Sequence, residues 1–207
     1  MNKLVKDALI LTCITVIAGF ALGLVYEITK APIAKAEEAA LQKAYQTVFA
    51  DAASFSDLDG FDSEAATKIV KDAGFTDETI DNCVQALDAS GNPIGYVITV
   101  TTSAGYGGNI TFSVGITNDS VINGYSITNI AETAGLGMKA RDEGEGTFSS
   151  QFVARNAEIF TVTKSGAHDS SEIDAISAAT ITSKAVTNGV NAGVTYFNSL
   201  VGGASNE

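Results

Sequence analysis

Residues that ligate metals or form cross-links are scarce in this chain. Its 207 residues include 2 Cys, 1 His and no Trp. A zinc, haem or iron–sulfur centre therefore lacks ligands, and a disulfide framework is excluded. Lys and Arg number 12 against 24 Asp and Glu, which gives a net charge of −12. This balance argues against a nucleic-acid partner, because binding a phosphate backbone needs a basic face.

Charge is also missing from residues 8–26, which read ALILTCITVIAGFALGLVY between Asp7 and Glu27. At about 1.5 Å per residue, a helix of this length nearly spans a hydrocarbon core of roughly 30 Å. The run is longer than the apolar region of a signal peptide, so we expect a retained single-pass anchor in the lipid bilayer. Lysines flank both ends of the run equally, so the charges leave its orientation open.

The rest of the chain predicts an α+β fold. We expect a helix over residues 31–50, and loops with short helical turns over the acidic residues 51–82. Two hairpins follow, over 84–102 and 110–130, each centred on a polar turn. A helical turn at 148–154, a strand at 159–163 and a helix over 183–201 complete the pattern. The expected parts are an anchor (1–30), a connecting region (31–82) and one domain (83–207) with an antiparallel sheet and flanking helices.

Four hydroxyl side chains cluster in the stretch DAISAATITS, residues 174–183, directly before the last predicted helix. Small residues allow a ligand to approach the backbone closely, and a helix N-terminus offers free N–H groups to an anion. Taken alone, the stretch favours a simpler interpretation, in which Thr182 or Ser183 caps the helix.

Two further small-residue stretches precede it, GYGG at 105–108 and ETAGLG at 132–137. In this order, the three stretches resemble the FMN-binding domain of the G subunit of the Rnf electron-transport complex. They are also similar to the related C subunit of the sodium-translocating NADH:quinone reductase. Those proteins have G-Y-G-G, E-T-P-G-L-G and D-x-x-S-G-A-T-x-T-S. Here Ala134 replaces the proline and Ala178 replaces a glycine, and alanine would be strained if position 178 needs a positive φ.

The resemblance implies that a flavin transferase links FMN through its phosphate to Thr180. It places Thr133, Gly135 and Leu136 against the isoalloxazine ring, whereas Glu132 either orders its loop or touches the flavin. Tyr106 either stacks on the ring or fills an apolar gap. The expected cofactor-binding residues are Tyr106, Gly107, Glu132, Thr133, Gly135, Leu136, Gly137, Asp174, Ser177, Ala178, Ala179, Thr180, Thr182 and Ser183.

The same resemblance implies an electron carrier within a membrane complex that couples electron flow between ferredoxin and NAD to ion movement. Its partners would be the other membrane and redox subunits, with the FMN domain on the extracytoplasmic side. No G-x-G-x-x-G fingerprint follows a predicted strand, which fits a carrier that does not itself reduce NAD.

Three alternatives stay open. The chain could be the corresponding quinone-reductase subunit, a stand-alone flavin reductase, or an anchored scaffold module whose glycine loops are structural.

Overall fold

The computed structural model describes residues 3–203 of the chain. A six-stranded antiparallel sheet runs in the order β1-β2-β3-β4-β5-β6, and two parallel strands, β7 and β8, form a second small sheet. The elements are α1 (Lys3–Val48), β1 (Ser54–Asp57), α2 (Ser63–Asp72), β2 (Glu78–Leu87), β3 (Pro93–Thr102), β4 (Ile110–Thr117), β5 (Val121–Asn129), η1 (Gly137–Arg141), η2 (Ser149–Phe152), β6 (Arg155–Asn156), β7 (Thr161–Thr163), β8 (Glu172–Asp174) and α3 (Thr180–Gly203).

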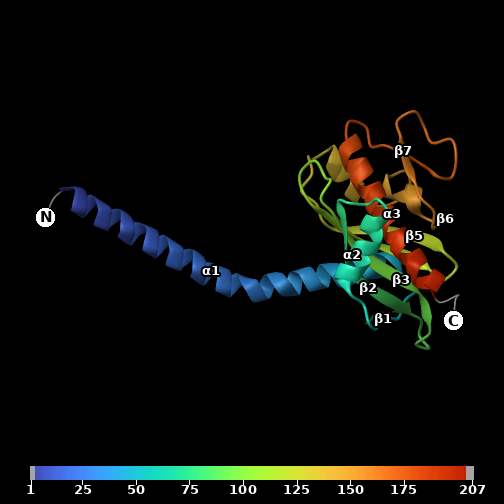
Figure 1. Cartoon of the computed structure of the whole chain (residues 1–207), viewed down its shortest axis with the longest axis horizontal. Coiled ribbons are helices and arrows are strands. Elements are labelled where there is room, and N and C mark those ends of the chain that lie inside the picture. The colour runs from blue at the N-terminus through green and yellow to red at the C-terminus, as the bar shows by residue number, and fades with distance from the viewer. Residues whose placement is uncertain (1–2, 204–207) are drawn as a thin grey trace. The chain divides into compact units, whose positions relative to one another are not determined.

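Both predicted hairpins are present, as β2–β3 and β4–β5. They form because alternating apolar residues along each strand face one side of the sheet, while polar turns separate the strands. Ile98, Val100 and Phe112 are fully buried on this side, together with Val186 and Val190 of α3. Helices α2 and α3 cover this face of the sheet (Figure 1).

The opposite face of the sheet carries a second, smaller core. Tyr45 and Val48 from the last turns of α1 pack there against Val84 and Val97. Gly115 lies beneath Val48, and an added Cβ at Gly115 would stand 2.9 Å from the Val48 Cβ. The end of α1 is therefore part of the folded unit that spans residues 41–207.

Residues 1–40 form a separate compact unit. Within residues 3–203, α1 is the one helix long and apolar enough to cross a membrane, and none of its most apolar window is buried. The helix expected at 31–50 is a continuation of α1. Pro32 lies inside it and removes one backbone donor, but the Ala-, Glu- and Lys-rich residues that follow favour helix and continue it.

The expectation of loops with short helical turns over residues 51–82 is wrong in three places. Strand β1 pairs with β2, helix α2 fills ten residues, and β2 begins at Glu78. The side chain of Asp62 accepts hydrogen bonds from the N–H groups of Glu64 and Ala65 and so caps α2. The sequence does not predict this short amphipathic helix, because most of its residues are polar and only Ala66 and Val70 are buried.

Candidate functional site

Helix α3 begins at Thr180, three residues earlier than the sequence predicts. The prediction that Thr182 or Ser183 caps the helix is therefore wrong, because both lie within its first turn. The Ser183 hydroxyl donates to the Ala179 carbonyl at 2.9 Å and accepts from the Ile176 N–H at 2.9 Å. Ser183 is fully buried, so its role is to close the loop that leads into the helix.

A cavity of about 610 Å³ lies at this helix start. It brings together residues from all three stretches that the sequence singled out. Its lining comprises Tyr106, Glu132, Thr133, Leu136, Gly137, Ala178, Ala179, Thr180, Ile181 and Thr182.

The carboxylate of Glu132 joins the three stretches. Its Oε1 accepts from the Gly107 N–H at 3.1 Å, and its Oε2 accepts from the Thr182 hydroxyl at 2.9 Å. The Glu132 side chain is buried, with 8% of the residue exposed. A buried carboxylate without partners would be costly, so both contacts hold the loops in place.

Glycine is required where the backbone passes this carboxylate. A Cβ on Gly137 would stand 2.6 Å from both Glu132 Oε2 and Thr182 Oγ1, and one on Gly107 would stand 2.1 Å from the Ala131 carbonyl oxygen. Gly135 lies in the same turn and does not line the cavity. The glycines of the two loops thus allow the close packing that forms one wall of the cavity.

Three apolar side chains line the cavity and remain accessible to solvent. Tyr106 is 71% exposed, Ile181 54% and Leu136 39%. Accessible apolar groups grouped around a hollow are typical of a ligand-binding site. Sequence reasoning missed Ile181, because the predicted helix began after it. In the sequence, Ile181 is an apolar residue between the hydroxyl residues Thr180 and Thr182. This pattern indicates a cavity-lining side chain only when the start of α3 at Thr180 is known.

Ala178 adopts a left-handed conformation, with φ of 61°. Position 178 therefore does need a positive φ, the condition under which the sequence predicts strain, and the alanine there is strained. The left-handed residue turns the chain between the loop and the first turn of α3, where Thr180 follows.

Asp174 and Ser177 line a second cavity, of about 530 Å³, and do not face the first. The side chain of Gln151 makes two hydrogen bonds to the backbone of Asp174. The Asp174 N–H donates to Gln151 Oε1 at 2.7 Å, and Gln151 Nε2 donates to the Asp174 carbonyl at 3.1 Å. The stretch 174–183 is thus divided between two cavities, with Thr180 on the first.

The chemistry of the first cavity fits FMN. Its apolar side chains suit the flat ring system, and the first N–H groups of α3 suit a phosphate, since they have no partner within the helix. No Lys, Arg or His stands among the lining residues within 3–203, so backbone N–H groups and threonine hydroxyls are the available anion donors. The Thr180 hydroxyl lies at the same helix end.

Two family models match the chain. A model described as FMN-binding domain matches residues 105–195, which include all three stretches. A model described as RnfG N-terminal region matches residues 1–48, which correspond to α1.

Individual proteins are similar over nearly the whole chain. The G subunit of the Na(+)-translocating ferredoxin:NAD(+) oxidoreductase complex of Acetobacterium woodii is 34% identical over 94% of this chain and 92% of its own length. The G subunit of the ion-translocating oxidoreductase complex of Methanosarcina acetivorans is 28% identical over 97% of this chain and 98% of its own. The crystal structure of Shewanella oneidensis NqrC is 20% identical with a TM-score of 0.55, over 82% of this chain and 99% of that one. This last likeness shows the fold.

Proposed function

Since this chain belongs to the family of G subunits of ion-translocating ferredoxin:NAD(+) oxidoreductase (Rnf) complexes, we propose that it holds FMN covalently on Thr180 and relays electrons between the other subunits. It is a flavoprotein subunit of such a complex, with one candidate membrane helix.

One observation supports the site above all others. Three stretches whose lining residues are as many as 76 positions apart, from Tyr106 to Thr182, meet at one cavity and are joined there by Glu132. A scaffold module with structural glycines needs turns, but it does not need those turns to converge on a hollow lined by accessible apolar side chains.

Different residues of the cavity bind different parts of FMN. The N–H groups at the start of α3 bind the phosphate, and the Thr180 hydroxyl oxygen supplies the ester bond to it. Leu136 packs against the ring, and the Thr133 hydroxyl lies near its polar edge. FMN supplies one- and two-electron exchange when bound. The ester keeps it in a cavity that is open to solvent.

We propose the following cellular setting, which membership of this family supports. A flavin transferase attaches the FMN, α1 anchors the chain in lipid, and the 41–207 unit lies on the extracytoplasmic side. The partners are the remaining membrane and redox subunits of the complex.

The covalent link is tested by in-gel flavin fluorescence of denatured full-length protein that was co-expressed with a flavin transferase. We expect a fluorescent band from the parent chain and none from Thr180→Val. Thr161→Val, at an exposed threonine of β7, is the matched control and should stay fluorescent. A dark parent band beside a labelled positive control would refute the covalent link.

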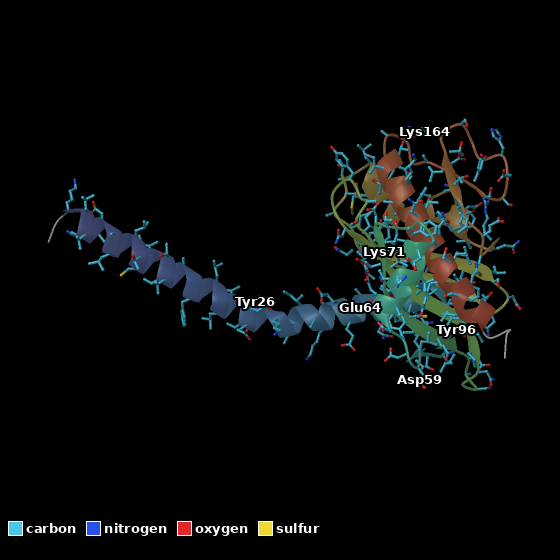
Figure 2. The ribbon with its side chains drawn as sticks, in the orientation of Figure 1. Tyr26, Asp59, Glu64, Lys71, Tyr96 and Lys164 are labelled. Carbon is cyan, nitrogen blue, oxygen red and sulfur yellow. The ribbon has the colours of Figure 1, made fainter. Side chains whose placement is uncertain are left out.

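Orientation is tested with Lys164→Cys, in an exposed loop that Figure 2 shows at the outer surface. Neither native cysteine should react with a membrane-impermeant reagent, because Cys83 is fully buried and Cys13 lies within the apolar run at residues 8–26. A membrane-impermeant maleimide should label the variant in intact cells. Labelling that requires broken cells would place the domain on the cytoplasmic side.

A further inference from the structure

Glu132 is the one acidic or basic side chain that lines the FMN cavity among the described residues. No ion pair compensates it there, since the one ion pair within residues 3–203 joins Lys68 and Asp72. Its two partners, the Gly107 N–H and the Thr182 hydroxyl, are neutral dipoles. They orient the carboxylate and leave its net charge in place.

We propose that the charge of Glu132 lowers the reduction potential of FMN in this cavity. The inference rests on the proposed function, which places the ring there. Each electron delivered into the cavity adds one negative charge unless a proton accompanies it. The Glu132 side chain is buried, so water screens its negative charge less than that of an exposed carboxylate, and the charge opposes that addition.

The N-terminus of α3 acts in the opposite direction. Its effect equals about half a positive charge and fades within the first turn, and in the proposed arrangement the phosphate of FMN already occupies it. The full charge of Glu132 therefore dominates at the ring. A lowered potential suits a carrier that exchanges electrons with ferredoxin-linked subunits.

The test is a redox titration of the full-length, FMN-labelled protein in detergent. Dithionite donates two electrons to each flavin, and flavin absorbance reports the oxidised fraction. Glu132→Gln removes the charge and retains the geometry, since the amide oxygen still accepts from Gly107 and the amide nitrogen can donate to the Thr182 hydroxyl. We expect the reduced-to-oxidised ratio at a fixed potential to rise about tenfold, which equals about 30 mV for a two-electron couple.

Thr182→Val tests the effect of the same charge, and its expected shift in midpoint potential has the opposite sign to that of Glu132→Gln. It removes the hydroxyl that stabilises the carboxylate and keeps the side-chain shape, so in alkaline buffer at about pH 9, which keeps carboxylates ionised, the midpoint potential should fall. Loosened loops alone would move both variants in the same direction. Glu64→Gln removes an exposed carboxylate on α2 (Figure 2) and should leave the potential unchanged.

An unchanged midpoint in Glu132→Gln overturns the proposal. So does a midpoint in Thr182→Val that equals or exceeds that of the parent, even if Glu132→Gln fails to fold. A parent protein that contains no flavin refutes the proposed function instead, which keeps the two failures distinct.

Discussion

Replacing Ala178 with glycine should stabilise the protein, although most alanine-to-glycine changes destabilise. Ala178 has φ of 61° and is exposed, so its methyl group contributes strain and little packing. The left-handed conformation costs alanine about 1–2 kcal/mol. Glycine avoids this cost but loses about 0.4–1 kcal/mol through the greater freedom of its unfolded chain. The expected net gain is about 0.5–1 kcal/mol.

The gain is measurable by thermal unfolding of the full-length protein in detergent. For a domain of roughly 150–250 residues, 1 kcal/mol moves Tm by about 2–4 °C, so Ala178→Gly should raise Tm by about 1–4 °C. If the strain also slows attachment of FMN, in-gel fluorescence of the variant should develop faster than that of the parent.

Two exposed alanines provide matched controls. Ala154 has φ of 58° and lies outside the proposed FMN cavity, so Ala154→Gly should stabilise by a similar amount without changing the rate of labelling. Ala134 is not among the residues with positive φ, so Ala134→Gly should destabilise by about 0.4–1 kcal/mol. If all three variants lower Tm, the strain argument is wrong.

Three further predictions concern buried groups. Asn191 makes 2.9 Å hydrogen bonds to both the N–H and the carbonyl of Phe160, so Asn191→Ala should cost about 3 kcal/mol in urea unfolding, because two buried backbone groups lose their partners; a loss under 1 kcal/mol would contradict this. Burial raises the pKa of Glu78, so the folded state binds its proton more tightly and stability should fall as pH rises from about 4.5 through the raised pKa. Glu78→Gln should lack this component, and parallel curves of unfolding free energy against pH would refute it. Gly137→Ala should lower the free energy of unfolding by about 1–3 kcal/mol, because the added methyl group forces Glu132 away from Thr182. An unchanged Tm would contradict this, since it would mean that the loops accommodate the methyl group without loss of stability.

The sequence predicts the sheet well because its strands obey a local rule. Residues 110–117 alternate between apolar and polar side chains and end at a polar turn, so both ends of β4 are found correctly. Helix α2 escapes prediction because Ala66 and Val70 are its only buried residues and charged residues surround them. Its capping residue, Asp62, is informative only once the helix is suspected.

The three stretches that the sequence singles out meet at the cavity, but five of the residues expected to bind the cofactor do not line it, namely Gly107, Gly135, Asp174, Ser177 and Ser183. The three stretches identify the residues around the cavity, yet Glu132 contacts a group 25 positions away and another 50 positions away. No local pattern encodes such contacts, since they depend on how the strands bring distant loops together. The separation of Asp174 and Ser177 from Thr180 has the same origin, because the left-handed Ala178 redirects the chain between them.

The last turns of α1 decide where a soluble fragment must begin. Tyr45 belongs to the same helix as the apolar run at residues 8–26, but the Thr99 hydroxyl that it approaches lies 54 residues further along the chain. A fragment cut at the end of α1 would expose Val84 and Val97 on an open sheet face and invite aggregation. A fragment beginning at Leu41 retains the whole compact unit. The end of α1, the candidate membrane helix, is thus also the first structural element of the compact unit that begins at Leu41.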